Sequence, residues 1–353
     1  MSFQVLACGS NGSYQLGLGN DDDHDSLQAV IGLEEFACTK PKQFAFGGNH
    51  TFALYPDGEL FATGDNKHGQ CGVVTPEILK KFTRVSGSWK HVAAGWEFSI
   101  LCSFSDELYC CGYGPKGELG LGENRVSAHN LEKIELPKIS RSASISEVKC
   151  SINHVVVKLD SGEFLGWGAA RKGQLGIQKP VVTKSGKIKP KPALWKPQLL
   201  PFKAKTFCLG RDRTILVNDT ITILGSESLE LNVKAHTVKA MWSSIHYIQD
   251  NGRKHALDGE NRIVSVGNNL HGQCFDYNMM SPMKAFAVGS EHGLVLLENN
   301  SVFAWGWGEH GNCGIMRDEN VTFDYLNKIY EGDDEVVEIA GGLATTWLVV
   351  KKR

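Results

Sequence analysis

Short segments in which apolar and polar residues alternate recur along the whole chain, and many of them end in glycine. The run "LFATG" ends at Gly64 and the run "VFAWG" ends at Gly306. Alternation with a period of two predicts β-strands, and no sustained period of 3.6 residues predicts a helix. The pattern therefore predicts an all-β protein.

The glycines that end these runs, which we call anchor glycines, recur at regular intervals. Successive anchors are separated by 55, 48, 56, 57, 42 and 39 residues. Such a spacing indicates one structural unit repeated along the chain. The seven anchors are Gly9, Gly64, Gly112, Gly168, Gly225, Gly267 and Gly306.

Two motifs accompany the anchors. Every anchor except Gly225 is followed by a related stretch, such as "GDNKHGQCG" from Gly64, which we call the post-anchor segment. Each anchor is preceded by two apolar segments joined by a turn, as in "FAFGGNHTFAL" from Phe44. Pairs such as Asp57-Gly58, which favour tight hairpins, then lead into the anchor strand. Each unit thus reads strand, turn, strand, hairpin, strand, loop.

Seven small antiparallel sheets cannot each bury both faces alone, and radial packing of the sheets solves this problem. We therefore predict a seven-bladed β-propeller that forms a single domain over residues 1–353. The last unit, "IAGGLATTWLVV" from Ile339, has no anchor strand, whereas the chain starts with one, "FQVLACG" from Phe3. We expect the N-terminal strand to join the C-terminal strands and so complete the last sheet.

Composition narrows the functional classes. The chain has 42% apolar and 22% charged residues and a net charge of −2, so no general charge draws it to nucleic acid or to anionic membranes. We find no apolar run long enough to span a membrane and no signal-like start. We therefore expect a cytoplasmic and nuclear protein, in which the ten cysteines are reduced thiols.

The repeated His-x-x-Cys spacing in "HGQCG", "HGQCF" and "HGNCG" raises the question of a metal site. Zinc needs about four ligands brought together, yet the equivalent positions elsewhere carry lysine and leucine, so we predict neither a metal nor a cofactor. The histidine position holds Ser13, His68, Lys116, Lys172, His271 and His310, and the cysteine position holds Leu16, Cys71, Leu119, Leu175, Cys274 and Cys313.

The other candidate chemistry also fits the repeat. Two Gly-x-Gly-x-x-Gly matches, at Gly112 and Gly306, lack the helix that a dinucleotide site requires. His50, His154 and His292 share one slot of the repeat, where we expect a hydrogen-bonded strut of the turn. Of the neighbours Cys110 and Cys111, we expect one to face the core. No catalytic constellation remains, and we predict that the protein is not an enzyme.

Candidate interface residues are those that the repeat does not explain. Because each strand reverses direction, the turns before the anchor strands and the post-anchor loops should share one face. Trp96, Arg211 and Trp307 stand on that face, where such residues favour partner binding; local packing is the alternative. The stretch 179–197 has six lysines, four prolines and Trp195, which predicts either a solvated loop or contact with tRNA or an acidic protein surface.

The combination of apolar-x-Ala-Gly-x-x-His, Asp-Gly and aromatic-x-x-Gly-x-Asn-x-x-Gly-Gln-Leu-Gly resembles the regulator of chromosome condensation (RCC1) repeat over essentially the whole chain. The resemblance implies a seven-bladed propeller. Similarity to a short, single-propeller fungal member implies a heterodimer with a small zinc-binding electron-carrier protein that serves diphthamide synthesis and Elongator-dependent modification of tRNA wobble uridines. The activity of the founding member, guanine-nucleotide exchange on a small Ran-like GTPase, is the alternative.

Overall fold

The computed structural model describes residues 2–138, 143–182, 186–226, 228–249, 262–277, 281–317 and 320–353. The pair Asn251-Gly252, for which the sequence also predicts a tight hairpin, and residues 183–185 of the stretch 179–197 lie outside these residues. The chain divides into two compact units, each described here by itself. The first unit comprises Met1–Lys42, Leu79–Thr83 and Val233–Arg353, and the second comprises Gln43–Ile78 and Arg84–Asn232.

Strands make up almost all of the regular structure, and the described residues contain one 3-10 helix, η1 (Glu34–Phe36). The prediction of an all-β protein is confirmed. The strands of the first unit are β1 (Ser2–Gly9), β2 (His24–Ala29), β21 (Ala235–Ala240), β22 (Ser244–Gln249), β23 (Ile263–Gly267), β24 (Met283–Val288), β25 (His292–Leu297), β26 (Val302–Trp307), β27 (Thr322–Tyr330), β28 (Glu335–Gly341) and β29 (Thr345–Lys352).

The second unit holds most of the other strands, and β6 runs across the boundary between the units. These strands are β3 (Gln43–Phe46), β4 (His50–Leu54), β5 (Leu60–Asp65), β6 (Ile78–Val85), β7 (Trp89–Ala94), β8 (Phe98–Ser103), β9 (Leu108–Tyr113), β10 (Ser127–Lys133), β11 (Ile145–Cys150), β12 (His154–Leu159), β13 (Phe164–Ala169), β14 (Val181–Val182), β15 (Ile188–Lys189), β16 (Ala193–Leu199), β17 (Thr206–Gly210), β18 (Arg213–Val217), β19 (Ile221–Gly225) and β20 (Leu229–Leu231).

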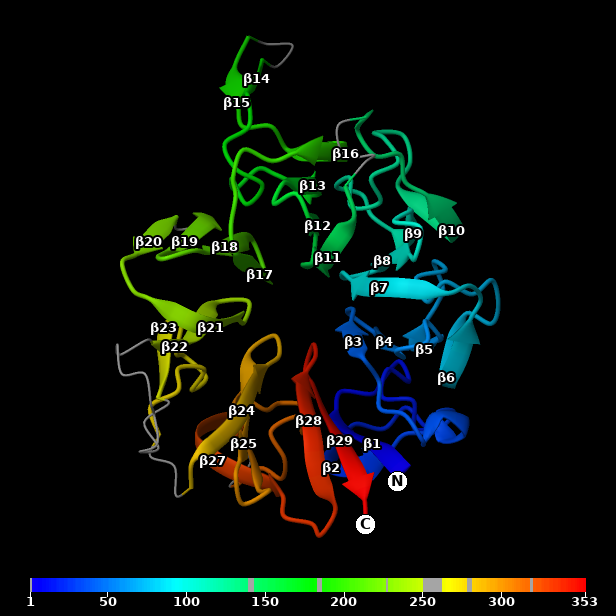
Figure 1. Cartoon of the computed structure of the whole chain (residues 1–353), viewed down its shortest axis with the longest axis vertical. Helices are drawn as coiled ribbons and strands as arrows, with labels where there is room; N and C mark the ends of the chain where they lie inside the picture. Colours follow the sequence, from blue (N-terminus) through cyan, green and yellow to red (C-terminus); the bar gives the residue numbers. More distant parts are fainter. Residues whose placement is uncertain are drawn as a thin grey trace. The chain divides into compact units, whose positions relative to one another are not determined.

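Seven antiparallel sheets carry one anchor glycine each, and we number the sheets by anchor (Figure 1). From first to seventh, the strand orders are β2-β1-β29-β28, β3-β4-β5-β6, β10-β9-β8-β7, β11-β12-β13-β16, β17-β18-β19-β20, β21-β22-β23 and β24-β25-β26-β27. The fifth sheet keeps a short fourth strand although its post-anchor motif is lost, whereas the sixth has three strands in the described part of the chain.

The first sheet combines strands from both ends of the chain, as predicted. β1 pairs with β29 over its whole length, from Ser2 opposite Lys352 to Gly9 opposite Thr345. The N and C labels of Figure 1 both lie at this sheet. That the whole chain forms one domain stays a prediction.

The anchors are glycine because no side chain fits at this point of the strand. Gly64 has a φ of +108°, and a Cβ atom there would lie 2.3 Å from the carbonyl oxygen of Asn49 in the neighbouring turn. The other six anchors share the positive φ. Both the dihedral angle and the space therefore exclude larger residues.

The core fills both faces of the sheets. Trp167, Trp305 and Trp347 are fully buried in three different sheets, and the indole N–H of Trp167 donates to the carbonyl of Glu118 at 2.7 Å. We expected one of Cys110 and Cys111 to face the core, and the structure buries both side chains. Adjacent strand residues point to opposite faces, and here both faces are covered.

Candidate protein-interaction surface

The turns that join the first two strands of each sheet lie side by side in the second unit. The backbone N–H of Gly48 donates to the carbonyl of Trp96 at 2.9 Å, and the N–H of Trp96 donates to Ile152 at 3.2 Å. The hydroxyl of Ser151 then donates to the carbonyl of Arg211 at 2.9 Å. Four sheets therefore present one continuous row of turns, which we call the turn row.

The post-anchor loops lie on the same face as the turn row. The ammonium of Lys116 donates to the side-chain oxygen of Asn153 at 2.9 Å, and the amide of Asn153 donates to Glu118 at 2.9 Å. Asn153 belongs to the turn row, whereas Lys116 and Glu118 belong to a post-anchor segment. The prediction that turns and post-anchor loops share a face is confirmed within this unit.

Trp96 stands in the turn row with 41% of its surface exposed. Two carbons of its indole lie 3.1 and 3.3 Å from the position that a Cβ atom on Gly48 would occupy. Gly48 therefore leaves room for the indole to lie across the neighbouring turn. The side chain packs locally on one side and is accessible on the other; its role in partner binding stays a prediction.

The structure brings Arg211 into the same row but places Trp195 elsewhere. Arg211 is exposed in the turn between β17 and β18. Trp195 is half-buried within strand β16, where its carbonyl accepts from Gly122 at 2.9 Å. The residue that the sequence placed at the end of a basic loop is thus part of a sheet.

Within the described part of the stretch 179–197, β14 and β15 form a two-stranded hairpin, and residues 193–197 belong to β16. Val182 and Ile188 are 70% and 73% exposed on it, and Figure 1 shows the hairpin projecting beyond β13 and β16. The sequence does not predict these two strands, because lysine and proline dominate the segment.

Trp307 lies in the first unit, at the end of β26. Its indole stacks on the ring of His271, with ring centroids 4.5 Å apart and planes 16° from parallel. His271 is one of the histidines of the His-x-x-Cys segments. Its ring therefore makes an aromatic contact between two sheets.

Most of the other histidines and cysteines of these segments also serve packing, whereas His310 is exposed and its Nδ1 lies 2.8 Å from a carboxylate oxygen of Asp23. His68 stacks on Tyr113 at 5.2 Å, and Cys71 and Cys313 are buried like the leucines at the equivalent positions. All ten cysteines are free thiols. Over the ranges that the structure describes, no group of three or more His, Cys, Asp or Glu side chains is arranged to hold a metal ion.

His50, His154 and His292 act as buried struts, as predicted. Each donates or accepts a hydrogen bond with a hydroxyl of the next sheet, at 2.8 Å to Ser99, 3.3 Å to Thr214 and 3.0 Å to Thr346. Burial lowers the pKa of His50 and His154 to about 3 and that of His292 to about 4. The rings are neutral near pH 7.

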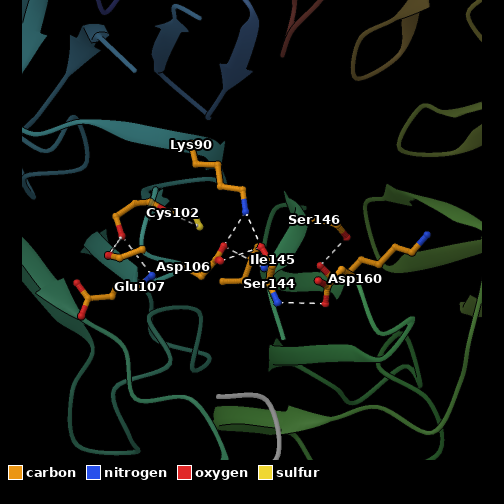
Figure 2. Close-up of polar contacts among 11 residues, drawn as sticks. Lys90, Cys102, Asp106, Glu107, Ser144, Ile145, Ser146 and Asp160 are labelled. Atoms are coloured by element: carbon orange, nitrogen blue, oxygen red, sulfur yellow. Dashed lines mark hydrogen bonds and ion pairs between the residues drawn. The ribbon is translucent and has the colours of Figure 1, made fainter. Parts of the chain in front are cut away.

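A polar cluster ties the third and fourth sheets together on the hairpin side (Figure 2). The ammonium of Lys90 lies 2.7 Å from a carboxylate oxygen of Asp106 and 2.9 Å from the hydroxyl of Ser144. Asp106 also accepts from this hydroxyl and from the backbone N–H of Ile145. Burial alone would raise the pKa of Asp106, but these hydrogen bonds lower it.

Similarity in three dimensions defines the class of protein. The fold matches Prp20p from Saccharomyces cerevisiae, whose crystal structure was described with its binding to Gsp1p and histones, with a TM-score of 0.79 and 16% identity, covering 100% of this chain and 92% of that chain. The seven sheets are therefore the blades of a seven-bladed β-propeller, as the sequence predicted. No helix in the described residues is long and apolar enough to cross a membrane.

Sequence similarity then gives the family. Residues 4–54, 42–70 and 283–312 match models of the regulator of chromosome condensation (RCC1) repeat. An RCC1 repeat-containing protein of Schizosaccharomyces pombe is 30% identical over 385 residues, which cover 99% of both chains. This chain belongs to the RCC1 repeat family. The regulator of chromosome condensation of Xenopus laevis is 24% identical over 99% of this chain and 90% of its own length.

Proposed function

We propose that this propeller is a non-enzymatic interaction scaffold that binds a protein partner through the turn row. The observation that carries the proposal is the placement of Trp96 and Arg211, two exposed residues in turns joined by backbone contacts. Tryptophan and arginine are the side chains most enriched among residues that dominate binding energy. A row fixed by hydrogen bonds to backbone carbonyls presents them with little loss of conformational entropy.

The partner that we propose is the small zinc-binding electron-carrier protein of diphthamide synthesis and the Elongator pathway. The chain resembles the fungal alpha-tubulin suppressor, and its full-length similarity to a fission-yeast protein supports a fungal single-propeller type. The role would be regulatory, in Elongator-dependent wobble-uridine modification of tRNA and in diphthamide formation, in the cytoplasm and nucleus. The same proposal includes a contact of this protein with Elongator. It also includes a contact of tRNA with the Lys-rich hairpin of β14 and β15.

Guanine-nucleotide exchange on a Ran-like GTPase is the second candidate. It is favoured by full-length similarity to the Xenopus regulator of chromosome condensation and by the fold of Prp20p, which was described as binding Gsp1p. Identities of 24% and 16% support a shared fold, and the exchange activity is tested by itself.

One experiment separates the two candidates. The purified full chain is used to recover partners from a fungal lysate, and the same preparation is assayed for release of labelled nucleotide from a Ran-type GTPase. We expect a stoichiometric complex with the small zinc protein and nucleotide release at the intrinsic rate. Catalytic acceleration of release, with no zinc protein recovered, would sink the first proposal and support the second.

A further inference from the structure

The sixth sheet ends in an open strand edge where its sister sheets carry a fourth strand. β22 pairs with β23 from Ser244 opposite Gly267 to Ile248 opposite Ile263. In the part of the chain that the structure describes, no strand pairs with the other edge of β23. The separation from anchor Gly267 to the next anchor, 39 residues, is also the shortest in the chain.

The sister sheets show how this edge is used. In three of them, the carbonyl four residues before the anchor accepts from the residue that directly follows the fourth strand: Val5 from Val30, Leu108 from Ile134 and Phe164 from Leu200. In four, the N–H two residues after the anchor donates to the start of that strand: Asn66 to Glu77, Gly114 to Val126, Ala170 to Pro192 and Gly308 to Val321.

The corresponding groups of the sixth sheet are the carbonyl of Ile263 and the N–H of Asn269. Neither has a partner among the residues that the structure describes. Residues of a strand alternate in the edge toward which their N–H and C=O point, and Asn268 donates inward to Ser243 at 3.1 Å. Ile263, Ser265 and Gly267 therefore direct their backbone groups to the open edge.

A side chain next to this edge is less covered than its counterparts in the sister sheets. At the position of Cys274, the other five sheets carry Leu16, Cys71, Leu119, Leu175 and Cys313, and each of these is 0% exposed. Cys274 is half-buried. It lines a groove of about 600 Å³ together with Ile263, Ser265, Asn269 and Phe275. The groove lies where a fourth strand covers the sister sheets.

We propose that the edge of β23 binds an extended segment of a partner protein, which adds as the fourth, antiparallel strand of the sixth sheet. The inference rests on the proposed function as a protein-binding scaffold and assigns it a second contact. Backbone hydrogen bonds would hold the segment, as in other cases of strand addition.

The sister strands define the length and the pattern of this segment. The bonded span runs from Val126 to Ile134 in the third sheet and from Pro192 to Leu200 in the fourth, nine residues in each case. The third and ninth residues are buried and apolar: Ala128 and Ile134, and Leu194 and Leu200. The occupant is therefore a nine-residue strand with apolar side chains at its third and ninth positions.

A synthetic peptide with the sequence of residues 321–329, VTFDYLNKI, serves as the probe, because it has phenylalanine third and isoleucine ninth. We expect saturable binding to the full chain and at least about tenfold slower alkylation of Cys274, while the exposed Cys38 reacts at an unchanged rate. N-methylation of the ninth residue should weaken binding about tenfold, and N-methylation of the eighth, whose N–H points away, less than about twofold.

Three results would overturn the inference: no saturable peptide binding, equal effects of the two N-methyl groups, or protection of Cys274 in the free chain. Protection in the free chain would mean that the edge is already covered by this chain or by a second copy. The scaffold proposal is tested separately, because a partner that binds normally while Cys274 stays reactive supports the turn row and contradicts only the strand addition.

Discussion

The imidazole Nε2 of His50 lies 2.8 Å from the hydroxyl of Ser99, which in turn lies 2.7 Å from the carbonyl oxygen of Gln70. Because the hydroxyl proton goes to Gln70, the hydroxyl oxygen accepts the proton of Nε2. The ring is thus held as the neutral tautomer with its proton on Nε2, and a second proton would place a buried charge. The same reasoning applies to His292, whose partner Thr346 donates to Asn312.

These histidines predict a loss of stability in mild acid. Their pKa values in the folded state lie at about 3 to 4, below the ordinary 6.5, so the unfolded chain takes up protons first as the pH falls below 6.5. Each histidine should lower the free energy of unfolding by about 1.4 kcal/mol per pH unit between these limits. Urea titrations at pH 7 and pH 5 give the free energy of unfolding at each pH. Between these values it should fall less for His50→Gln than for the parent, by the contribution of one histidine; an equal fall in both proteins would contradict the assignment.

The cluster around Asp106 predicts a second effect. Asp106→Asn keeps a residue that tolerates the φ of +58° but removes the charge beside Lys90, and we expect a loss of about 1–3 kcal/mol in the free energy of unfolding. Asp219→Asn is the control, since its ion pair with Lys205 is 82% exposed on the aspartate side; that change should cost less than about 1 kcal/mol. Equal losses in urea titrations would argue against a structural role of the cluster.

The anchor glycines can be tested by one methyl group. Gly64→Ala places a Cβ atom against the Asn49 carbonyl, whereas Gly162→Ala, in a hairpin with a φ of +82°, meets no atom within 4 Å. We expect the hairpin variant to lose about 1–2 kcal/mol from its dihedral angle alone, and the anchor variant to lose distinctly more. Thermal unfolding of the two variants gives the comparison, and similar melting temperatures would show that the turn yields.

Trp96→Ala tests the turn row as a binding surface. The side chain is 41% exposed, so its removal should leave unfolding within about 1 kcal/mol of the parent and weaken partner affinity by at least about 2 kcal/mol, or roughly thirtyfold. Trp307→Ala is the matched variant in the other unit. Titration calorimetry with the purified partner measures the affinity of both variants. An unchanged affinity of Trp96→Ala would show that Trp96 lies outside the interface.

The repeat made most of the fold predictable. A position that tolerates only glycine marks every sheet, and a position that holds either leucine or cysteine is recognisable as core because its chemistry varies while its size does not. The shortest anchor separations, 42 and 39 residues, leave the least chain for a fourth strand. They correspond to the three-residue β20 and to the edge of β23 that no described strand pairs with.

Features set by tertiary contact were beyond a reading of the sequence. Trp195 belongs to β16 because Ala193 and Leu194 beside it are buried, a fact that neighbouring prolines conceal. The hydrogen bond between Asp106 and Ser144 joins residues of neighbouring sheets that no spacing relates. Likewise, Cys274 occupies the same position of the repeat as its buried counterparts. Its greater exposure is visible only in the structure, where no described strand pairs with the outer edge of β23.

The pairing of β1 with β29 has a consequence for biosynthesis. β1 leaves the ribosome more than three hundred residues before its partner β29, which begins at Thr345. Until β29 is synthesised, the edge of β1 that pairs with it has unpaired backbone groups, and such an edge is prone to aggregation. Cellular yield of this protein should therefore respond to chaperone supply during synthesis, even for variants whose finished form is fully stable.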